Sequence, residues 1–182
     1  DVVQVPTSLL AQVDSSIGGK TGINLGNSKN IIGAFHQPKI TYMNVEALKT
    51  LPEEEYISGI GEVIKYAFIE ENACEEKVNF LEFLMDNYED ILDRKTTVLL
   101  KMVKICAKIK ADVVDKDEKE GGLRKILNLG HTFAHGIEKL CHISHGKAVV
   151  IGMNMAFKLS LENNLIEEEY YKQFLNLCEK FN

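Results

Sequence analysis

Apolar residues recur with a helical period through most of the chain, from Glu53 onward. Between residues 96 and 114 they stand at spacings of four, three, four and four, at Val98, Met102, Ile105, Ile109 and Val113. These spacings place them on one face of an α-helix, because each turn holds ~3.6 residues. A continuous apolar face has to be buried against other elements. The pattern therefore predicts an all-helical domain over residues 53–182.

The other helices are expected on the same grounds, between breaks made by glycine, proline and polar residues. Gly121 and Gly122 end one helical run before the next begins. The predicted ranges are 53–69, one or two helices within 75–92, 96–114, 123–140, 146–163 and 167–180. The predicted fold class is therefore predominantly α.

The first 52 residues have a mixed character. Residues 2–5 are rich in valine and predict a strand. Four glycines in residues 14–30 indicate a loop or hairpin and not a helix. Residues 31–35 and 39–43 are short strand candidates, and Asn44 caps a brief helix after them. This part of the chain is expected to hold the last strands and loops of an α/β domain.

Composition narrows the class of protein. The 182 residues are 45% hydrophobic and 26% charged, which is ordinary for a globular protein. The formal net charge of −6 argues against nucleic-acid binding, because that function needs a basic face. No apolar run reaches the ~20 residues that cross a membrane, and we expect no membrane partner. The four cysteines form no CxxC pair, which predicts reduced thiols in a cytoplasmic protein.

Four of the five histidines fall within residues 127–153, at His131, His135, His142 and His145. His131 and His135 are four apart, so a helix presents both on one face. Neutral imidazoles grouped in this way suit zinc, which commonly takes a carboxylate as well at a catalytic site. The alternative is that some of them are ordinary helix histidines with backbone partners. The histidines by themselves leave both interpretations open.

A Gly-Lys-Thr sequence centred on Lys20 invites comparison with a phosphate-binding P-loop. The first glycine of that motif should stand where the chain has Asp14, and no helical period follows. A flexible glycine-rich loop remains, which presents Asp14, Lys20, Lys29 and Asn30 and can bring amides and ammonium groups to an anion. The alternative is a surface hairpin with solvated lysines.

Gly59 and Gly61 stand near the start of a predicted helix, where each costs about 1 kcal/mol relative to alanine. Glycine is favoured there when another group has to approach the backbone closely. Glu62 and Lys65 follow on one face, three residues apart. This pair is either a carboxylate ligand beside an ammonium that polarises a substrate oxygen, or a surface ion pair of little energetic value.

Polar residues lead along the chain into His131. In the helix predicted here, Arg124 and Asn128 would lie one turn apart and form a strip of donors. Arg124 suits a carboxylate, because a planar guanidinium can donate two parallel hydrogen bonds. Lys110 and Glu120 stand upstream of this strip. A strip of salt bridges between helices is the alternative.

Four motifs, in order, resemble the 3-dehydroquinate synthase family: VPTSLLAQVDSSIGGKTGIN, GEVIKYAFI, KADVVDKDEKEGGLRKILNLGHTFAHGIE and HGKAVVIGM. The resemblance implies a lyase of the shikimate pathway that converts 3-deoxy-D-arabino-heptulosonate 7-phosphate to 3-dehydroquinate and phosphate. It implies NAD and a bound zinc or cobalt ion as cofactors, a small sugar phosphate as substrate, and a homodimer in the full-length protein. The implied reaction proceeds by transient NAD-dependent oxidation, phosphate elimination, reduction and internal aldol closure.

By this resemblance, three residues would hold the metal: Glu62, His131 and His145. The phosphate would be held by Lys20, Asn30 and His135, so that His135 lies off the metal. The substrate carboxylate would be held by Lys110 and Arg124. The catalytic groups would be Asp14, Lys65, Asn128 and His135. The nucleotide would contact Thr7, Ser8, Lys20, Lys29, Ala47, Leu48, Lys49 and Thr50.

The family also implies a division into domains. Residues 1–52 would be the partial end of an α/β NAD-binding domain, and residues 53–182 would be an α-helical metal- and substrate-binding domain. The chain opens with DVVQVPTSLL and has no initiator methionine, so we expect a fragment. The resemblance implies a glycine-rich dinucleotide-binding domain before this point, and without that domain we expect the fragment to be inactive alone. HTFAHG replaces the more usual HTFGHA, and Lys147 stands where glutamate is common; neither change touches an expected ligand.

Three alternatives remain. One is a sugar-phosphate cyclase that makes another carbocycle, such as a deoxy-inosose or a valiolone, and has less need of a carboxylate clamp. Another is a metal-dependent glycerol or alcohol dehydrogenase of the same superfamily, which would give net redox chemistry. The third is a helical fragment with only a structural role.

Overall fold

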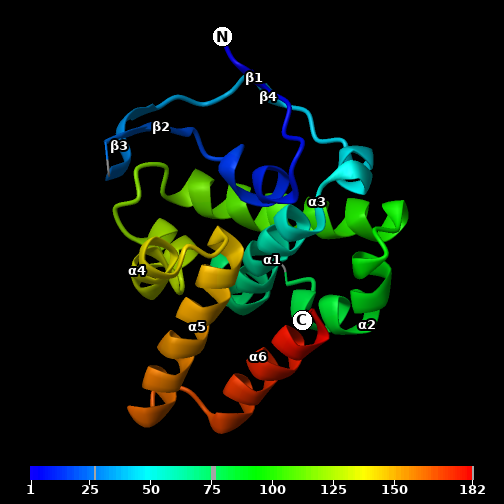
Figure 1. Ribbon diagram of the computed structural model, residues 1–182, viewed down its shortest axis with the longest axis vertical. Helices are drawn as coiled ribbons and strands as arrows, with labels where there is room; N and C mark the ends of the chain where they lie inside the picture. Colours follow the sequence, from blue (N-terminus) through cyan, green and yellow to red (C-terminus); the bar gives the residue numbers. More distant parts are fainter. Residues whose placement is uncertain (27, 75–76, 182) are drawn as a thin grey trace.

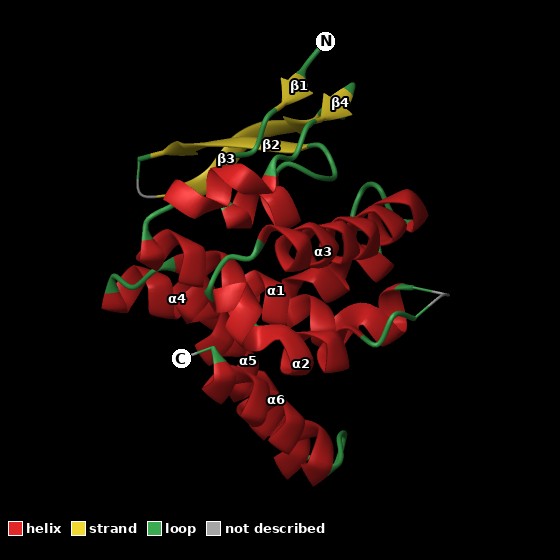
Figure 2. Ribbon diagram, turned by 90° about the vertical axis from the view of Figure 1, so that its right-hand side faces the viewer, coloured by secondary structure: helices red, strands yellow, loops and turns green. Residues whose placement is uncertain are grey.

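Helices form the body of the molecule, and a thin layer of short strands covers one end of it (Figures 1 and 2). This computed structural model describes residues 1–26, 28–74 and 77–181. Within them the order is β1 (Val3–Gln4), η1 (Ala11–Ser15), β2 (Lys20–Leu25), β3 (Ser28–Phe35), β4 (Ile40–Thr41), η2 (Val45–Thr50), α1 (Glu53–Ala73), α2 (Phe80–Leu92), α3 (Thr96–Lys116), η3 (Leu123–Asn128), α4 (His131–Cys141), α5 (His145–Glu162) and α6 (Glu168–Lys180). The fold is predominantly α, as the sequence predicted.

The strand layer consists of two separate pairs. β1 and β4 are parallel neighbours, with Val3 opposite Ile40. β2 and β3 form the antiparallel hairpin that the glycines indicated, in which Lys20 pairs with Phe35. The prediction for residues 14–30 was wrong at its start, because Asp14 lies in η1, a single turn of π-helix. The strand expected at residues 2–5 finds its partner later in the chain, in β4.

The core lies between the helices and continues into the first 52 residues. Leu9, Val13, Val45 and Leu48 are at most 4% exposed and belong to the same buried cluster as Val63 of α1. Apolar side chains of the segments around η1 and η2 therefore fasten the strand layer to the helices. The buried core includes residues on both sides of residue 52. The domain boundary expected at residue 52 stays a prediction.

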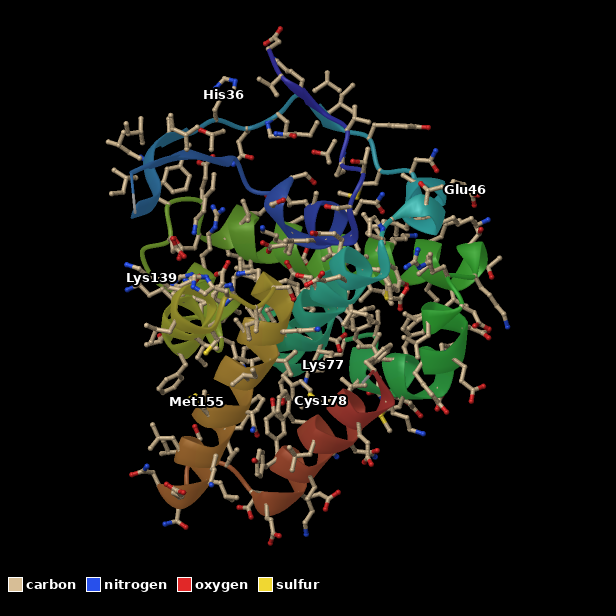
Figure 3. The ribbon with its side chains drawn as sticks, viewed as in Figure 1. His36, Glu46, Lys77, Lys139, Met155 and Cys178 are labelled. Atoms are coloured by element: carbon tan, nitrogen blue, oxygen red, sulfur yellow. The ribbon has the colours of Figure 1, made fainter. Side chains whose placement is uncertain are left out.

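Polar side chains lie both on the surface and in the interior. Figure 3 shows His36 and Lys139 pointing away from the helical body, and both are exposed. All four cysteines are free, with Cys106 buried and Cys141 exposed. None of the helices in the described ranges combines the length and the hydropathy that a membrane crossing requires.

The helix predicted over residues 123–140 does not exist as one element. Its first part is the 3₁₀ helix η3. Leu129 leaves the helical region with a ψ of 126°, and Gly130 has a φ of 80° before α4 begins at His131. The cause is tertiary, because a Cβ on Gly130 would lie 2.7 Å from the backbone nitrogen of Met153 in α5. The chain turns there to let η3 and α4 pack against α5. Arg124 and Asn128 both lie in η3, where a turn holds about three residues, so positions four apart do not share a face. The strip of donors expected along one helix into His131 was therefore wrong.

Glycines let the backbones of α1, α4 and α5 approach each other closely. A Cβ on Gly61 would lie 2.4 Å from the carbonyl oxygen of Gly146, and one on Gly146 would lie 1.8 Å from the carbonyl oxygen of Ser58. A Cβ on Gly152 would meet the carbonyl oxygen of Gly130 at 2.1 Å. The close approach that the sequence indicated near Gly61 is confirmed, and the partner is the first turn of α5.

We predict that Gly61→Ala destabilises the protein by about 1–3 kcal/mol, because the new methyl group collides with backbone and not with a side chain that can move. Helix propensity alone would favour alanine. Gly136→Ala in α4 is the matched control, since nothing lies within 4 Å of its Cβ position. That change should stabilise by about 0.5–1 kcal/mol. Urea unfolding measures both, and changes of the same sign would contradict the packing described here.

Candidate metal and substrate site

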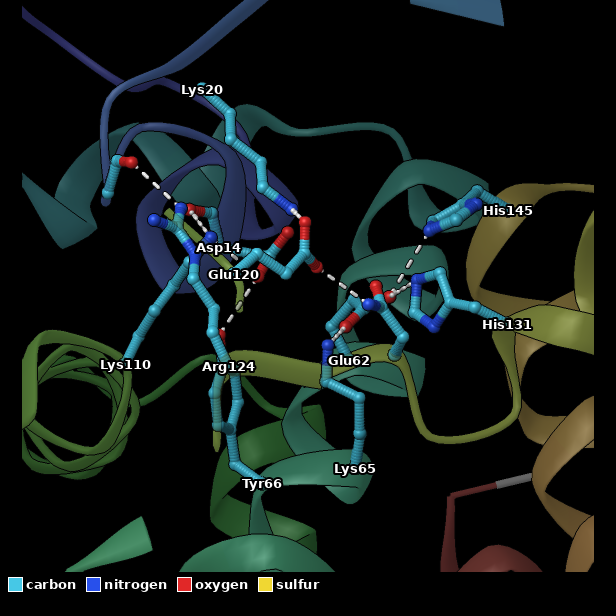
Figure 4. Close-up of polar contacts among 12 residues, drawn as sticks. Asp14, Lys20, Glu62, Lys65, Tyr66, Lys110, Glu120, Arg124, His131 and His145 are labelled. Carbon is cyan, nitrogen blue, oxygen red and sulfur yellow. Dashed lines mark hydrogen bonds and ion pairs between the residues drawn. The ribbon is translucent and has the colours of Figure 1, made fainter. Parts of the chain in front are cut away.

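Three side chains from three helices meet at the junction that the glycines create. Glu62 follows Gly61 in α1, His131 is the first residue of α4, and His145 is the first residue of α5. The Glu62 Oε1 atom lies 3.2 Å from His145 Nε2 and 3.5 Å from His131 Nε2 (Figure 4). One ligand atom from each residue lies within 4.8 Å of the others.

Each imidazole is oriented by a partner on its other nitrogen. His131 Nδ1 lies 3.2 Å from the carbonyl oxygen of Leu129, which can only accept a hydrogen bond. His145 Nδ1 lies 3.4 Å from Glu138 Oε2. A proton on Nδ1 leaves Nε2 with a free lone pair, as a metal ligand requires. Glu138 was not singled out in the sequence, although it closes the motif HTFAHGIE.

Two of the three residues, Glu62 and His131, are in the protonation state that a metal requires. Burial raises the pKa of Glu62, but the Lys65 ammonium and the hydrogen bond from His145, with a smaller contribution from His131, together outweigh burial and hold the pKa below its ordinary value. Burial lowers the pKa of His131, which favours its neutral form. The hydrogen bond to Glu62 raises the pKa of His145 in the absence of a metal. In a tetrahedral zinc site with ligand bonds of ~2.1 Å, the ligand atoms lie roughly 3.4 Å apart. The distances from Glu62 Oε1 to the two Nε2 atoms, 3.2 and 3.5 Å, are close to this value, so the donor set fits zinc.

Buried charges extend from this cluster toward η1. The Lys65 ammonium donates to Glu62 Oε2, and both residues are at most 1% exposed. Asp14 accepts hydrogen bonds from Lys110 Nζ at 2.8 Å and from the Tyr66 hydroxyl at 2.9 Å. Three of the predicted residues, Asp14, Lys65 and Lys110, therefore lie together in the structure.

The charges of this group support one another. Burial raises the pKa of Asp14, but Lys110 and Lys65 outweigh it and hold the carboxyl well below its usual range. Burial lowers the pKa of Lys65, whereas Glu62 and Asp14 raise it above the ordinary value. Burial keeps the pKa of Lys110 lowered despite Asp14. Tyr66, which the sequence analysis did not select, orients Asp14 from within α1.

A second group lies between the hairpin and the loop after α3. Lys20 Nζ is 2.5 Å from Glu120 Oε2, and Asn128 Nδ2 donates to Glu120 Oε1 at 2.7 Å. A cavity of about 550 Å³ lies here, lined in part by Asp14, Lys20 and Lys110. Glu120 had been given no role, yet its carboxylate connects two of the predicted substrate residues. The predicted residues Lys29 and Asn30 lie on β3, and their side chains fall outside the described part of the structure.

Arg124 is 1% exposed and connects two backbone segments. Its Nη2 donates to the carbonyl oxygen of Gly18 at 2.8 Å, and its Nη1 donates to that of Glu118. The loop is also held by Asp117, whose carboxylate accepts from the amides of Gly121, Gly122 and Arg124 at 2.7–2.9 Å. In this structure Arg124 therefore holds the loop that carries Glu120, and its contact with a carboxylate stays a prediction.

The remaining predicted residues lie at the edges of this region. His135 is exposed, and its ring centroid lies 5.6 Å from that of His131, outside the metal cluster. Thr7 and Ser8 follow β1, while residues 47–50 lie in η2, which follows β4. Leu48 is fully buried, so its side chain is closed to a nucleotide.

Family models match the chain over its whole length. Residues 1–58 match the 3-dehydroquinate synthase N-terminal model, and residues 59–182 match the 3-dehydroquinate synthase C-terminal model. The chain belongs to the 3-dehydroquinate synthase family. Curated members named 3-dehydroquinate synthase include one from Alkaliphilus metalliredigens, 45% identical over 99% of this chain and 50% of its own length. Another, from Prochlorococcus marinus, is 51% identical over 91% of this chain and 45% of its own length.

The chain thus spans about half the length of the curated 3-dehydroquinate synthases it matches. A solved structure of 2-deoxy-scyllo-inosose synthase, complexed with carbaglucose-6-phosphate, NAD⁺ and Co²⁺, superposes with a TM-score of 0.87 at 27% identity, covering 99% of this chain and 48% of that one. A 2-epi-5-epi-valiolone synthase from Streptomyces hygroscopicus, with NAD⁺ and Zn²⁺ bound, gives a TM-score of 0.85 at 23% identity over 98% and 49%, and supports the fold alone.

We predict that the protein binds about one zinc ion and that His145→Ala weakens this binding at least about a hundredfold, because one of three ligands is lost. His145 is 28% exposed, so its removal should not unfold the core. His142→Ala is the control, since His142 lies outside the cluster. Metal analysis after dialysis and competition with a chelator measure both. Equal zinc retention by the two variants would contradict the assignment of His145 as a ligand.

Asp117→Asn should lower stability at neutral pH, because three amides hold the pKa of Asp117 below its ordinary value by donating to its carboxylate. A lowered folded-state pKa contributes stability above the unfolded value of ~3.9, and this contribution disappears as pH falls through the folded-state pKa. The difference between parent and variant should therefore shrink in acid. Urea unfolding at a series of pH values measures this. The control is Asp115→Asn, at an exposed neighbouring position, which should change the free energy of unfolding little. A pH-independent difference in stability for Asp117→Asn would be inconsistent with the charge effect.

Proposed function

We propose that this chain provides the metal- and substrate-binding half of a 3-dehydroquinate synthase, which converts 3-deoxy-D-arabino-heptulosonate 7-phosphate to 3-dehydroquinate and phosphate. The observation that carries the proposal is the meeting of Glu62, His131 and His145 beside buried lysines in a chain that the family models match throughout. Relatives at 45–51% identity support this reaction over those of the more distant cyclases.

The metal ligands in this proposal are Glu62, His131 and His145, and the metal is zinc or cobalt. Their donor set of one carboxylate and two imidazoles, with both Nδ1 atoms occupied, fits such an ion. A metal held there supplies Lewis-acid chemistry, which acidifies a coordinated hydroxyl. Lys65 keeps Glu62 ionised and places a second positive charge beside any oxygen that is losing a proton.

NAD is the second cofactor in the proposal. β1 and β4 are parallel neighbours, and ligands of parallel sheets bind beyond the carboxyl ends of the strands. Thr7 and Ser8 follow one strand, and residues 47–50 follow the other, which supports the assignment of these residues to the nucleotide. These residues would hold NAD, which would supply reversible hydride transfer.

The substrate is held by groups around the cavity near the hairpin. Lys20 now faces the carboxylate of Glu120, so its ammonium is placed to hold an anion, and we assign it to the phosphate together with Asn30 and His135. Asp14 and Asn128 present an acceptor and a donor to substrate hydroxyl groups. Water is excluded from the part of the site around Lys65, whose side chain is 1% exposed.

The carboxylate contacts have weaker support from the geometry than the metal ligands. Lys110 is bound to Asp14, and both outer nitrogens of Arg124 already donate to backbone carbonyls. This observation favours a second candidate function, that of a cyclase whose sugar phosphate substrate has no carboxylate. The similarity to the structure of 2-deoxy-scyllo-inosose synthase supports this second candidate. A homodimer and a cytoplasmic location stay predictions of the proposed function.

We predict that the product of the complete gene, loaded with zinc and supplied with NAD, releases phosphate and forms 3-dehydroquinate without net NADH. His145→Ala should lower kcat/KM by at least about 10³-fold, because several kcal/mol of charge stabilisation are lost. His142→Ala should retain the parent activity. Phosphate release, product absorbance and NADH absorbance are followed together.

Three outcomes would oppose this assignment. Net NADH formation would indicate a dehydrogenase of the same superfamily. Turnover of a sugar phosphate without a carboxylate, in place of the heptulosonate, would indicate another cyclase. A zinc-loaded protein that turns over none of these substrates would indicate a role outside catalysis.

A further inference from the structure

The two segments that follow the parallel strands are joined by few backbone hydrogen bonds. The pairing of β1 with β4 covers only two residues on each strand, from Val3 opposite Ile40 to Gln4 opposite Thr41. The last backbone bond between them runs from the amide of Tyr42 to the carbonyl oxygen of Gln4 at 2.9 Å. Beyond it the chains continue toward Thr7 and Ser8 on one side and toward η2 on the other.

The side chain of Gln12 connects these two segments beyond the last backbone bond. Its Nε2 donates to the carbonyl oxygen of Pro6 at 3.3 Å and to that of Asn44 at 2.9 Å. Pro6 stands directly before Thr7, and Asn44 is the residue that caps η2. One amide group therefore holds the entrances to both proposed nucleotide-binding segments.

The position of this amide is fixed. Gln12 is fully buried in η1, and its own backbone amide donates to the carbonyl oxygen of Ser8 at 3.0 Å. Both partners of Nε2 are carbonyl oxygens, which only accept, so the side chain has one favourable orientation. Leu9 and Val13, which are near Gln12 in the sequence, belong to the buried apolar cluster. Apolar contacts are non-directional and define the separation of the two segments less closely. The two hydrogen bonds supply the direction.

We propose that Gln12 is a positioning residue for the nucleotide: it fixes the separation between the segment of Thr7 and Ser8 and the segment of residues 47–50, without touching the nucleotide itself. The inference rests on the proposed function, which assigns both segments to NAD. Because the hydrogen bonds of Gln12 hold both segments in place before the nucleotide binds, binding does not incur the entropy cost of ordering them. Loss of the amide should therefore act on nucleotide affinity and leave the metal cluster unchanged, because neither Pro6 nor Asn44, the hydrogen-bond partners of the Gln12 side chain, is a metal ligand.

The test compares two buried side chains that each make two hydrogen bonds to the backbone, one near the proposed nucleotide site and one away from it. Gln12→Met keeps the length of the side chain and removes both hydrogen bonds. Glu70→Met is the matched control, because Glu70 is also buried and accepts from two backbone amides, those of Val78 at 2.6 Å and Phe80 at 2.8 Å, at the corner between α1 and α2. Both variants should lose stability for the same reason.

The measurements use the product of the complete gene. Calorimetric titration gives the dissociation constant for NAD, metal analysis gives the zinc content, and steady-state kinetics gives KM for NAD separately from kcat. We expect Gln12→Met to raise the dissociation constant and KM for NAD by about tenfold. Its kcat at saturating NAD should stay within about twofold and its zinc content at the parent level, while Glu70→Met keeps the parent affinity for NAD.

Each other result counts against the inference. An unchanged NAD affinity in Gln12→Met overturns it, and so does an equal loss in Glu70→Met, which would show a general effect of stability. Should Gln12→Met fail to fold, Gln12→Asn retains the amide but withdraws it by one methylene, and the same thresholds apply. If the parent protein binds no NAD, that result contradicts both the proposed function and this inference. That result is distinguishable, because it appears before any variant is made.

Discussion

The close contact between α1 and α5 is the constraint on which the site depends. Gly61 and Gly146 allow two backbones to approach to a distance that no side chain would permit, and Glu62 and His145 are their immediate neighbours in the sequence. The second glycine contact, between Gly130 and Gly152, sets α4 against α5 in the same way and places His131. The three ligand residues therefore meet because of packing between helices, and contacts between backbone atoms set the positions from which their side chains extend.

Buried charge is tolerated here because it is compensated in a chain of alternating sign. Glu62, Lys65, Asp14 and Lys110 follow one another through the interior, and each ammonium faces a carboxylate. Removing one partner from such a chain leaves an uncompensated charge, which costs far more than the pair contributes. The arrangement holds ionised groups at fixed positions next to the metal ligands, and water need not reorganise when charge develops there.

The sequence was sufficient where local pattern decides the structure and insufficient where distant contacts do. The apolar spacing at Val98 to Val113 gave α3, and Asn44 gave the start of η2, because propensity and capping act within a few residues. The break at Gly130 arises from Met153, and the role of Glu120 arises from Lys20, which lies 100 residues away in the chain. Gln12 shows no signal at all, since a lone glutamine beside apolar residues is common. The metal ligands emerged only through resemblance to a family, because spacing alone had also suggested His135.

His131 and His145 each begin a helix, and this has an electrostatic consequence. The aligned peptide dipoles of α4 and α5 place about half a positive charge at each amino terminus. Two macrodipoles thus converge on the cluster, with the Lys65 ammonium behind it. The combined field stabilises the carboxylate of Glu62 and repels a bare dication. A metal ion held by Glu62, His131 and His145 would therefore be bound more firmly together with a negatively charged oxygen ligand, and the field would favour the deprotonated form of a hydroxyl group that enters the site.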